Sequence, residues 1–312
     1  MFAFSKNNKA STGLTGISLQ PDGIAIVQAS VEAGQRPHVT ACEFRPWDGD
    51  AQGKVLARVA SDYALKRARC AVTLEDTQYK LLLTEAPDVK PDELRAAVRW
   101  RIKELIDFHI NDATLDVFDL PGARIPGQTR SMYVVVARTD AIQRHADLMH
   151  DADINLQVID IQELAQRNVA SLLAEDQQGV AFLVLNAQGG LLTITKQSEL
   201  YLSRSLAFGL DILQQNSDNL DAYFDRMALE VQRSLDYFDS HFRQAPLAHL
   251  VLAPLPTEIP GLVEYLNNNL NVKTSIMNLT GLVEFEKEIP LTTQVRCLPA
   301  LGAALRHEQK AL

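Results

Sequence analysis

Short apolar runs alternate with amphipathic stretches along most of this chain. Residues 13–45 divide into apolar segments separated by Gly and Pro, which predicts two or three strands. Residues 52–67 carry apolar side chains at helical spacing, and residues 70–74 return as an apolar strand. A similar succession of strands and helices recurs after residue 178. The pattern therefore predicts an α/β protein built from two related halves with a cleft between them.

The apolar pattern of residues 77–150 predicts a further α/β unit inside the first half. We expect strands at 78–84, 115–120 and 132–137, and helices from about 92 to 106 and from 140 to 151. Pro91 and the acids that follow it suit the first turn of a helix. Trp100 shares that helix with Leu94 and Val98, so its ring is expected in the core.

The second half predicts a comparable set of elements. Strands are expected at 182–185, 191–195, 200–205, 249–253 and 272–276, and helices at 228–243, 261–270 and 298–308. The turn at 175–179 is the expected boundary between the two halves.

Composition and charge narrow the class of protein. The 312 residues suggest two domains, and the net charge of −9 argues against a nucleic-acid partner. No run of 18 apolar residues occurs, and the apolar start of four residues is too short for a signal peptide. Cys42, Cys70 and Cys297 form no CxxC pair and no metal spacing, which fits a reducing cytoplasm. Cys42 and Cys70 have apolar neighbours and are expected in the core.

The segment 251–262 has the order strand, tight turn, helix. Such a turn commonly binds an anion, because backbone N–H groups at a helix N-terminus point toward the ligand. Here the turn holds Pro254, Leu255 and Pro256. Proline has no N–H to donate, and its φ is fixed. The segment therefore has the strand, turn and helix of a ligand-binding site, but its two prolines lack the N–H groups that would bind the ligand.

Six segments in sequence carry a resemblance to one family. They are Gly16–Val27, Arg99–Phe108, Val158–Ala165, Glu230–Phe238, Leu252–Leu262 and Ala300–Arg306. In this order they resemble PilM-like proteins of type IV pilus assembly, which have an actin-like ATPase fold. The shorter, degenerate form is most similar to the PilM-like proteins of mannose-sensitive haemagglutinin (MSHA) pilus systems.

The resemblance implies a duplicated, ribonuclease H-like α/β fold with two lobes. The first lobe would span 1–175, with its core at about 12–76 and 151–175 and an inserted α/β subdomain at about 77–150. The second lobe would span 176–312, with its own insert shortened to about 207–229.

The same resemblance implies that the nucleotide site is degenerate. The positions of the family's phosphate-binding turns and acidic or basic ligands hold Ser18, Gln20, Ala25, Leu185, Asn186, Pro254, Leu255 and Pro256. Asp22 is a candidate for a relocated carboxylate. Phosphoryl transfer without acidic metal ligands loses most of its charge stabilisation. We therefore expect no enzyme activity, no bound cofactor and no metal.

A partner is implied in place of a nucleotide. PilM-like proteins bind the cytoplasmic tail of a PilN-like bitopic membrane protein in a groove between the first and the inserted subdomains. In this chain Arg99, Arg101, Lys103 and Phe108 are the candidate partner-binding residues. We expect a non-catalytic cytoplasmic adaptor that also meets other pilus assembly components and reaches the inner membrane through its partner.

Two alternatives stay open from the family resemblance. One is a nucleotide-responsive ATP-binding protein that has moved its ligands. The other is an L-type cytoplasmic component of a type II secretion system, which normally continues into a membrane helix.

Other polar groups are interpreted as structural. His145 and His150 are five residues apart and do not share a helix face as an i,i+4 pair does, so both are expected at the surface, as are Asp107 and His109. Asp160 is expected to cap the helix that follows it, with Glu163 nearby. No GxSxG, HExxH or GxxxxGK[ST] string occurs, although an enzyme of unrelated chemistry stays a remote alternative.

Overall fold

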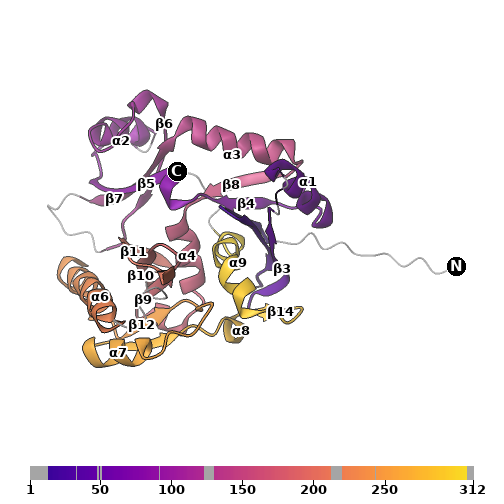
Figure 1. Ribbon diagram of the computed structural model, residues 1–312. Helices are drawn as coiled ribbons and strands as arrows, with labels where there is room; N and C mark the ends of the chain where they lie inside the picture. Colours follow the sequence, from indigo (N-terminus) through magenta and orange to yellow (C-terminus); the bar gives the residue numbers. More distant parts are fainter. Residues whose placement is uncertain are drawn as a thin grey trace.

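The computed structural model describes residues 13–307 apart from 33, 48, 50, 91, 123–129, 212–219 and 243. Within these residues the strands form three sheets, and helices cover or separate them (Figure 1). Pro91 at the expected helix start and part of the insert predicted at 207–229 lie outside the described residues.

The largest sheet has six strands in the order β14-β3-β2-β1-β4-β8. Its strands are β1 (Thr15–Gln20), β2 (Gly23–Ser30), β3 (His38–Pro46), β4 (Cys70–Thr73), β8 (Leu156–Asp160) and β14 (Glu284–Phe285). The first three form an antiparallel meander, whereas β4 and β8 run parallel to β1. One face packs on α1 (Gln52–Asp62) and α3 (Thr139–Asp151), because Ile17, Ile24 and Ile26 turn that way and are fully buried.

The second sheet has the order β11-β10-β9-β12-β13. Its strands are β9 (Val180–Leu185), β10 (Gly190–Lys196), β11 (Glu199–Leu206), β12 (His249–Leu252) and β13 (Lys273–Ile276). Again an antiparallel meander is followed by two parallel strands. The succession repeats that of β3-β2-β1-β4-β8, so the two halves share one topology, and the predicted duplicated fold is confirmed.

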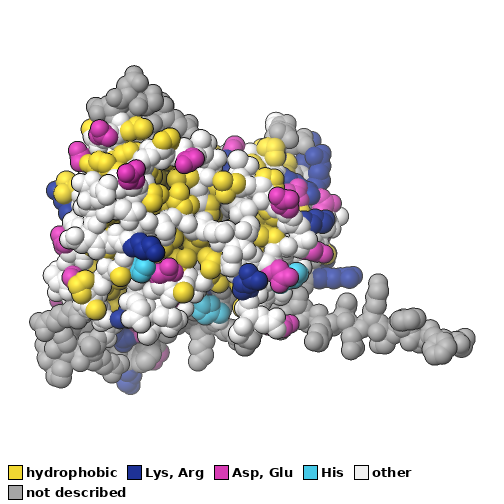
Figure 2. Space-filling view, turned by 90° about the horizontal axis from the view of Figure 1, so that it is seen from below, with side chains coloured by type: hydrophobic (Ala, Val, Ile, Leu, Met, Phe, Trp, Pro, Cys, Tyr) yellow, Lys and Arg dark blue, Asp and Glu magenta, His cyan; other side chains and the backbone are white. Residues whose placement is uncertain are grey.

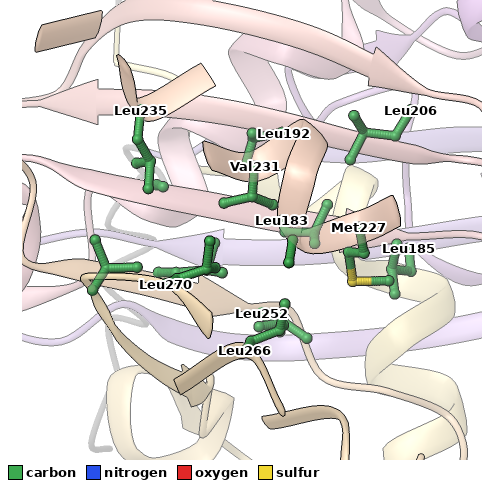
Figure 3. Close-up of a cluster of buried hydrophobic side chains, with 14 of the residues drawn as sticks. Leu183, Leu185, Leu192, Leu206, Met227, Val231, Leu235, Leu252, Leu266 and Leu270 are labelled. Atoms are coloured by element: carbon green, nitrogen blue, oxygen red, sulfur yellow. The ribbon is translucent and has the colours of Figure 1, made fainter. Parts of the chain in front are cut away.

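Two helices cover the outer face of the second sheet. They are α6 (Leu220–Phe242) and α7 (Leu262–Asn269). Figure 3 shows leucines of β9, β10 and β12 pointing toward Met227, Val231 and Leu235 of α6 and Leu266 of α7. Each fully buried leucine contributes roughly 1.5–3 kcal/mol relative to an exposed one, which makes this cluster a main source of stability.

The helices α4 (Gln162–Ala170) and α9 (Leu291–Ala304) lie side by side between the two large sheets (Figure 1). α9 packs on β1, β2, β3 and β4, and α4 packs on β9, β10 and β11. Gly302 allows their close contact, because a Cβ there would lie 2.1 Å from the carbonyl oxygen of Ala165. α4 of the first half thus packs on the second sheet, and α9 of the second half packs on the first sheet. The boundary between the halves near residue 175 stays a prediction.

The third sheet has the order β5-β7-β6 and lies within the segment 79–138. Its strands are β5 (Tyr79–Glu85), β6 (Ala113–Asp119) and β7 (Ser131–Arg138). The helix α2 (Leu94–Ile102) covers one face, where Val98, Ile102 and Val134 are fully buried. Short helical turns complete the described elements: η1 (Asp76–Gln78), η2 (Ile110–Asp112), η3 (Ala174–Gln177) and α8 (Leu279–Leu282).

The expected burial of Trp100 is wrong, since 72% of this residue is exposed. Val98 and Ile102 are four residues apart and share the buried face of α2, whereas Trp100 lies midway between them and points to the opposite side. The helix also ends at Ile102, earlier than predicted, which leaves Leu105 exposed beyond it.

Three other expectations require correction. His145 is buried on α3 and its Nε2 lies 2.9 Å from Oε1 of Gln78, because it shares a helix face with Met149. Asp160 does not cap α4; Ile161 holds that position, and Asp160 forms an ion pair with Arg306 at 2.7 Å. α9 begins at Leu291, ahead of the predicted residue 298, with Pro299 inside the helix.

None of the described helices is long and apolar enough to span a bilayer. Figure 2 shows the molecule from below the view of Figure 1, with apolar side chains gathered across the middle and charged ones mostly toward the sides. Apolar atoms form more than half of the surface of ordinary folded proteins, so this region by itself assigns no partner.

Candidate functional site

The first turn of the predicted nucleotide site, between β1 and β2, is held by the molecule's own α9. Nε2 of Gln20 donates a hydrogen bond to the carbonyl of Arg296 at 2.7 Å. The carboxylate of Asp22 forms an ion pair with the guanidinium of Arg296, which also lies 3.9 Å from the centre of the Phe44 ring. The proposed relocated carboxylate therefore already has a cation of this chain as its partner.

Ser18 and Ala25 face each other across the same hairpin. They are direct partners in the β1–β2 register, and both are buried. A buried hydroxyl and a methyl group offer neither the charge nor the reach that a metal-bound triphosphate requires.

The second turn, between β9 and β10, satisfies its own backbone groups. Oδ1 of Asn186 accepts hydrogen bonds from the backbone N–H of Gln188 at 3.0 Å and of Gly189 at 2.7 Å. These are the groups that a phosphate would take at such a turn. Leu185, at the end of β9, is buried in the core.

The chain after β11 closes over this second turn. The N–H of Leu210 donates to the carbonyl of Asn186 at 2.8 Å, and that of Asp211 donates to Ala187 at 2.9 Å. Gly209 makes the approach feasible, since a Cβ there would lie 2.4 Å from the nitrogen of Gly189. Residues 209–211 therefore occupy the space against the turn.

The third turn follows β12 and is apolar. The N–H of Ala253 donates to the carbonyl of Leu183 at 2.8 Å, and Leu255 is packed in the core. Pro254 and Pro256 have no N–H to offer. α7 begins at Leu262, slightly later than predicted, with Gly261 at a φ of +79° before it.

A cavity of about 550 Å³ lies elsewhere, between β5 of the third sheet and β11 of the second. Tyr133, Tyr201, Tyr237 and Phe242 supply aromatic walls, and Asp76 and Glu163 supply acids. The hydroxyl of Tyr133 donates to the carbonyl oxygen of Tyr201 at 3.0 Å and thereby links the two sheets. We call this cavity the β5–β11 groove.

A buried carboxylate lies at the base of the groove. Oε2 of Glu163 accepts a hydrogen bond from the hydroxyl of Tyr79 at 2.5 Å, and that hydroxyl accepts one from the N–H of Gln162 at 3.1 Å. Only 7% of Glu163 is exposed. Burial raises the pKa of Glu163, and the nearby Asp76 and Asp160 add to this, whereas the hydrogen bond from Tyr79 acts in the opposite direction.

The basic side chains of the groove are neutralised within the molecule. Lys80 forms an ion pair with Asp107 at 3.1 Å, and Arg204 forms one with Glu230 at 3.5 Å. By contrast, no ion pair recorded among the described residues includes Asp76 or Glu163. The basic side chains of the groove therefore have acidic partners, whereas its two acids have no recorded cation partner in the part of the chain that the structure describes.

Comparison with known proteins places the chain in a family. The sequence profile of the type IV pilus assembly protein PilM matches residues 47–222, more than half of the chain. The chain belongs to the PilM family of type IV pilus assembly proteins. A search of curated proteins gives no match.

Solved structures agree with this member of the PilM family in fold. One is described as the PilM-PilN type IV pilus biogenesis complex; its matching chain has a TM-score of 0.69 and 20% identity, over 94% of this chain and 97% of that one. Another is the cytoplasmic domain of EpsL, an inner-membrane component of the type II secretion system of Vibrio cholerae. It has a TM-score of 0.50 and 12% identity, over 92% and 94% of the two chains.

The residues predicted to bind a partner in this PilM-family protein lie outside the β5–β11 groove. Arg99 donates to the carbonyl oxygens of Ile110 and Ala113 at 2.5 and 3.0 Å and so braces the loop after α2. Arg101 lies 3.6 Å from the carboxylate of Glu85. Lys103 lies 5.9 Å from the Trp100 ring.

The fourth predicted residue, Phe108, is half-buried under the guanidinium of Arg138, 4.9 Å from its ring centre. Arg101 and Lys103 share the exposed side of α2, whereas Arg99 and Phe108 serve local packing. Sequence reasoning thus identified a charged surface and missed the groove.

Tyr79, Tyr133 and Tyr201 are the groove residues that sequence reasoning missed. Each lies on a predicted strand, where an aromatic side chain is ordinary. The available signal was Glu163, an acid placed just after a strand end and within a predicted helix. Among the described residues, no group of three or more His, Cys, Asp or Glu side chains is arranged to hold a metal.

Proposed function

We propose that this PilM-family protein is a non-catalytic cytoplasmic adaptor in the inner-membrane assembly of a type IV pilus. The observation that carries the proposal is the second turn, where the side chain of Asn186 takes the backbone N–H groups that a phosphate would need. The ion pair of Asp22 with Arg296 and the proline-rich third turn support it.

The partner we propose is the cytoplasmic tail of a PilN-like bitopic membrane protein. Support comes from the similar structure described as a PilM-PilN complex and from the open β5–β11 groove beside the third sheet. The adaptor would be peripheral to the inner membrane through this partner and would also meet other assembly components. No cofactor takes part.

We further propose that the pilus is of the MSHA type and that this protein is a counterpart of MshI. The support is the degenerate, shortened form of the sequence, in which only about twenty residues separate Phe208-Gly209-Leu210 from Glu230. A reading frame for a small protein with one transmembrane helix, next to this one in an MSHA gene cluster, is the expected neighbour.

Two measurements test the adaptor. Isothermal titration of the purified protein with Mg-ATP is expected to give no binding heat, because Asn186 accepts the backbone donors of the second turn and the third turn carries two prolines. Co-purification with the full-length PilN-like protein from the same gene cluster is expected to succeed. Micromolar ATP affinity, or a folded protein that does not retain this partner, would contradict the proposal.

Partner choice is proposed to depend on the exposed cations of α2. Replacing Arg101 and Lys103 together by Glu reverses charge without touching the core, since both side chains are exposed. We expect the double variant to lose preference for its own partner over the PilN-like protein of another pilus system. Unchanged preference in a competition pull-down would remove these two residues from the proposal.

A nucleotide-responsive protein is the second candidate function. The half-buried Gln20 and the exposed Asp22 at the first turn favour it, since an incoming magnesium ion could compete with Arg296 for the carboxylate. An Arg296→Ala variant that gained Mg-ATP binding would favour this candidate. For the type II secretion alternative, the likeness to EpsL concerns the fold alone; co-purification with pseudopilin-assembly components in place of pilus components would support it.

A further inference from the structure

Two cysteines from different halves of the chain meet where α9 packs on β3. Cys42 lies on β3 and is half-buried, whereas Cys297 lies on α9 with only 1% of it exposed. Both side chains pack in the same apolar cluster. The thiol of Cys297 donates a hydrogen bond to the sulfur of Cys42, so the two sulfur atoms are direct neighbours.

The contacts on either side place β3 and α9 in the same way. Side chains alternate along a strand, so Cys42 and Phe44 share one face of β3. The guanidinium of Arg296, which precedes Cys297 on α9, lies 3.9 Å from the centre of the Phe44 ring. The sulfur of Cys297 also forms a hydrogen bond with the backbone of Ile26, whose neighbour in the chain pairs with Cys42 in the β2–β3 register.

The two thiols differ in reactivity. The hydrogen bond from Cys297 lowers the pKa of Cys42, and burial acts in the opposite direction. The hydrogen bond to Cys42 and burial both raise the pKa of Cys297. Because the thiolate is the nucleophile, the half-buried Cys42 is the thiol that reacts first. Its conversion to a neutral adduct would remove the negative charge that keeps the proton on Cys297.

The third cysteine provides an internal comparison. Cys70 is fully buried, and its thiol donates to the backbone carbonyls of Leu65 and Ala68 at 3.8 and 3.6 Å. Burial raises the pKa of Cys70 to about 12. Its neighbours are backbone groups, so it lacks both the accessibility and the second thiol that Cys42 has.

We propose that Cys42 and Cys297 are a redox-responsive pair, which a low-molecular-weight disulfide converts into a disulfide bond between β3 and α9. In a reducing compartment such bonds are usually transient and serve catalysis or redox sensing. The bond would tether a helix of the second half to the first sheet and hold Arg296 beside Asp22 at the first turn. This inference does not depend on the proposed function.

The exchange balances with the small disulfide as the oxidant. The thiolate of Cys42 attacks one of its sulfur atoms, forms a mixed disulfide and releases one small thiolate. The sulfur of Cys297 then gives up its proton, attacks the Cys42 sulfur and releases the second small thiolate. The two protons of the protein thiols end on the two released thiols. The protein loses two electrons, and the oxidant gains them.

Mass spectrometry of the full chain tests the bond. The reduced, folded protein is incubated with the disulfide of 2-mercaptoethanol, then denatured and treated with iodoacetamide, which labels every remaining thiol. We expect the label on Cys70 alone, and a tryptic digest in which the peptides of Cys42 and Cys297 are joined until dithiothreitol is added. A lasting 2-mercaptoethanol adduct on Cys42, or label on Cys297, would overturn the proposal.

Thermal unfolding with and without dithiothreitol tests the tether. The bond closes a loop that contains most of the chain, so the oxidised protein should unfold about 4 °C or more above the reduced protein. Cys42→Ser and Cys297→Ser should each abolish this difference, whereas Cys70→Ser is the matched control and should keep it.

Each variant is compared only with its own reduced form, so a change in basal stability does not affect the outcome. The same difference in all three variants, or no difference in the natural protein, would overturn the tether. Co-purification with the PilN-like protein is a separate measurement, and its failure would leave the cysteine pair in place.

Discussion

Asn186 illustrates how a single side chain can replace a ligand. In a phosphate-binding turn, successive backbone N–H groups are left for the anion. Here the amide oxygen of Asn186 lies 3.0 and 2.7 Å from two of them, and its carbonyl accepts a further bond from Leu210. The turn keeps its shape without any bound group, because the satisfied donors need no external partner.

Replacing Asn186 by Ala should therefore destabilise the protein even though the residue is exposed. Two backbone donors lose their internal acceptor and must turn to water, at a cost of about 1 kcal/mol in the free energy of unfolding. Urea denaturation measures the change. Gln188→Ala is the control and should stay within about 0.5 kcal/mol. Equal effects of the two changes would contradict the role given to Asn186.

Glu163 should make stability depend on pH. Its pKa is raised above the ordinary value of 4.5, chiefly by burial, so the folded state binds the proton more tightly than the unfolded state. The stabilisation from this proton is complete below pH 4.5 and is lost as pH rises through the folded-state pKa. Relative to Glu163→Gln, the natural protein should lose stability as the pH rises above 4.5 and through the folded-state pKa.

Urea titrations of both proteins at several pH values above and below 4.5 measure this difference. Gln accepts the Tyr79 hydrogen bond without becoming charged, so it isolates the protonation effect. Parallel stability curves would show that Glu163 titrates alike in the folded and unfolded states.

At the scale of elements, the contact of α4 with α9 holds the two halves together. Each helix belongs to one half by sequence and packs on the sheet of the other. The contact depends on Gly302, where a methyl group would lie 2.1 Å from a backbone oxygen of α4. Backbone cannot move aside as a flexible side chain can, so the helices would have to separate.

Gly302→Ala is expected to cost about 3 kcal/mol or more in the free energy of unfolding. Gly53→Ala on α1 is the matched control, because no atom lies within 4 Å of the added methyl group. That change should be neutral or stabilising by up to about 1 kcal/mol through helix propensity. Thermal unfolding of both variants measures the effects, and a Gly302→Ala protein as stable as the control would refute the close-contact argument.

At the scale of the whole molecule, the β5–β11 groove draws on separate sheets. β5 belongs to the third sheet, β11 to the second, and Glu163 to the helix between the two large sheets. A segment bound there would contact the inserted unit and the second half at once. Binding should therefore stabilise their arrangement.

Hydrogen exchange should report this shared contact. With a peptide of the partner's cytoplasmic tail bound, amides of β5 and β11 are expected to gain protection together, while α1, on the far face of the first sheet, serves as the unchanged reference. Protection confined to α2 would move the docking surface to the face of Arg101 and Lys103 and contradict the groove.

The sequence by itself determined the duplicated fold and the chemistry missing from the three turns. Both are local properties: apolar periodicity predicts strands and helices, and a proline or a leucine at a turn position lacks a donor or a charge wherever the chain goes. The wrong expectation that Trp100 is buried also concerned a local property, because the spacing of Trp100 from Val98 places its side chain on the opposite side of a helix.

The tertiary structure alone decided which groups meet. Glu163 contacts Tyr79 from 84 residues away, and Arg296 reaches Asp22 from 274 residues away. No periodic signal encodes such pairs, because they depend on how α4 and α9 cross between the two sheets. α9 also brings Arg296 onto the first turn, so packing between distant segments decided which of its polar groups are already paired.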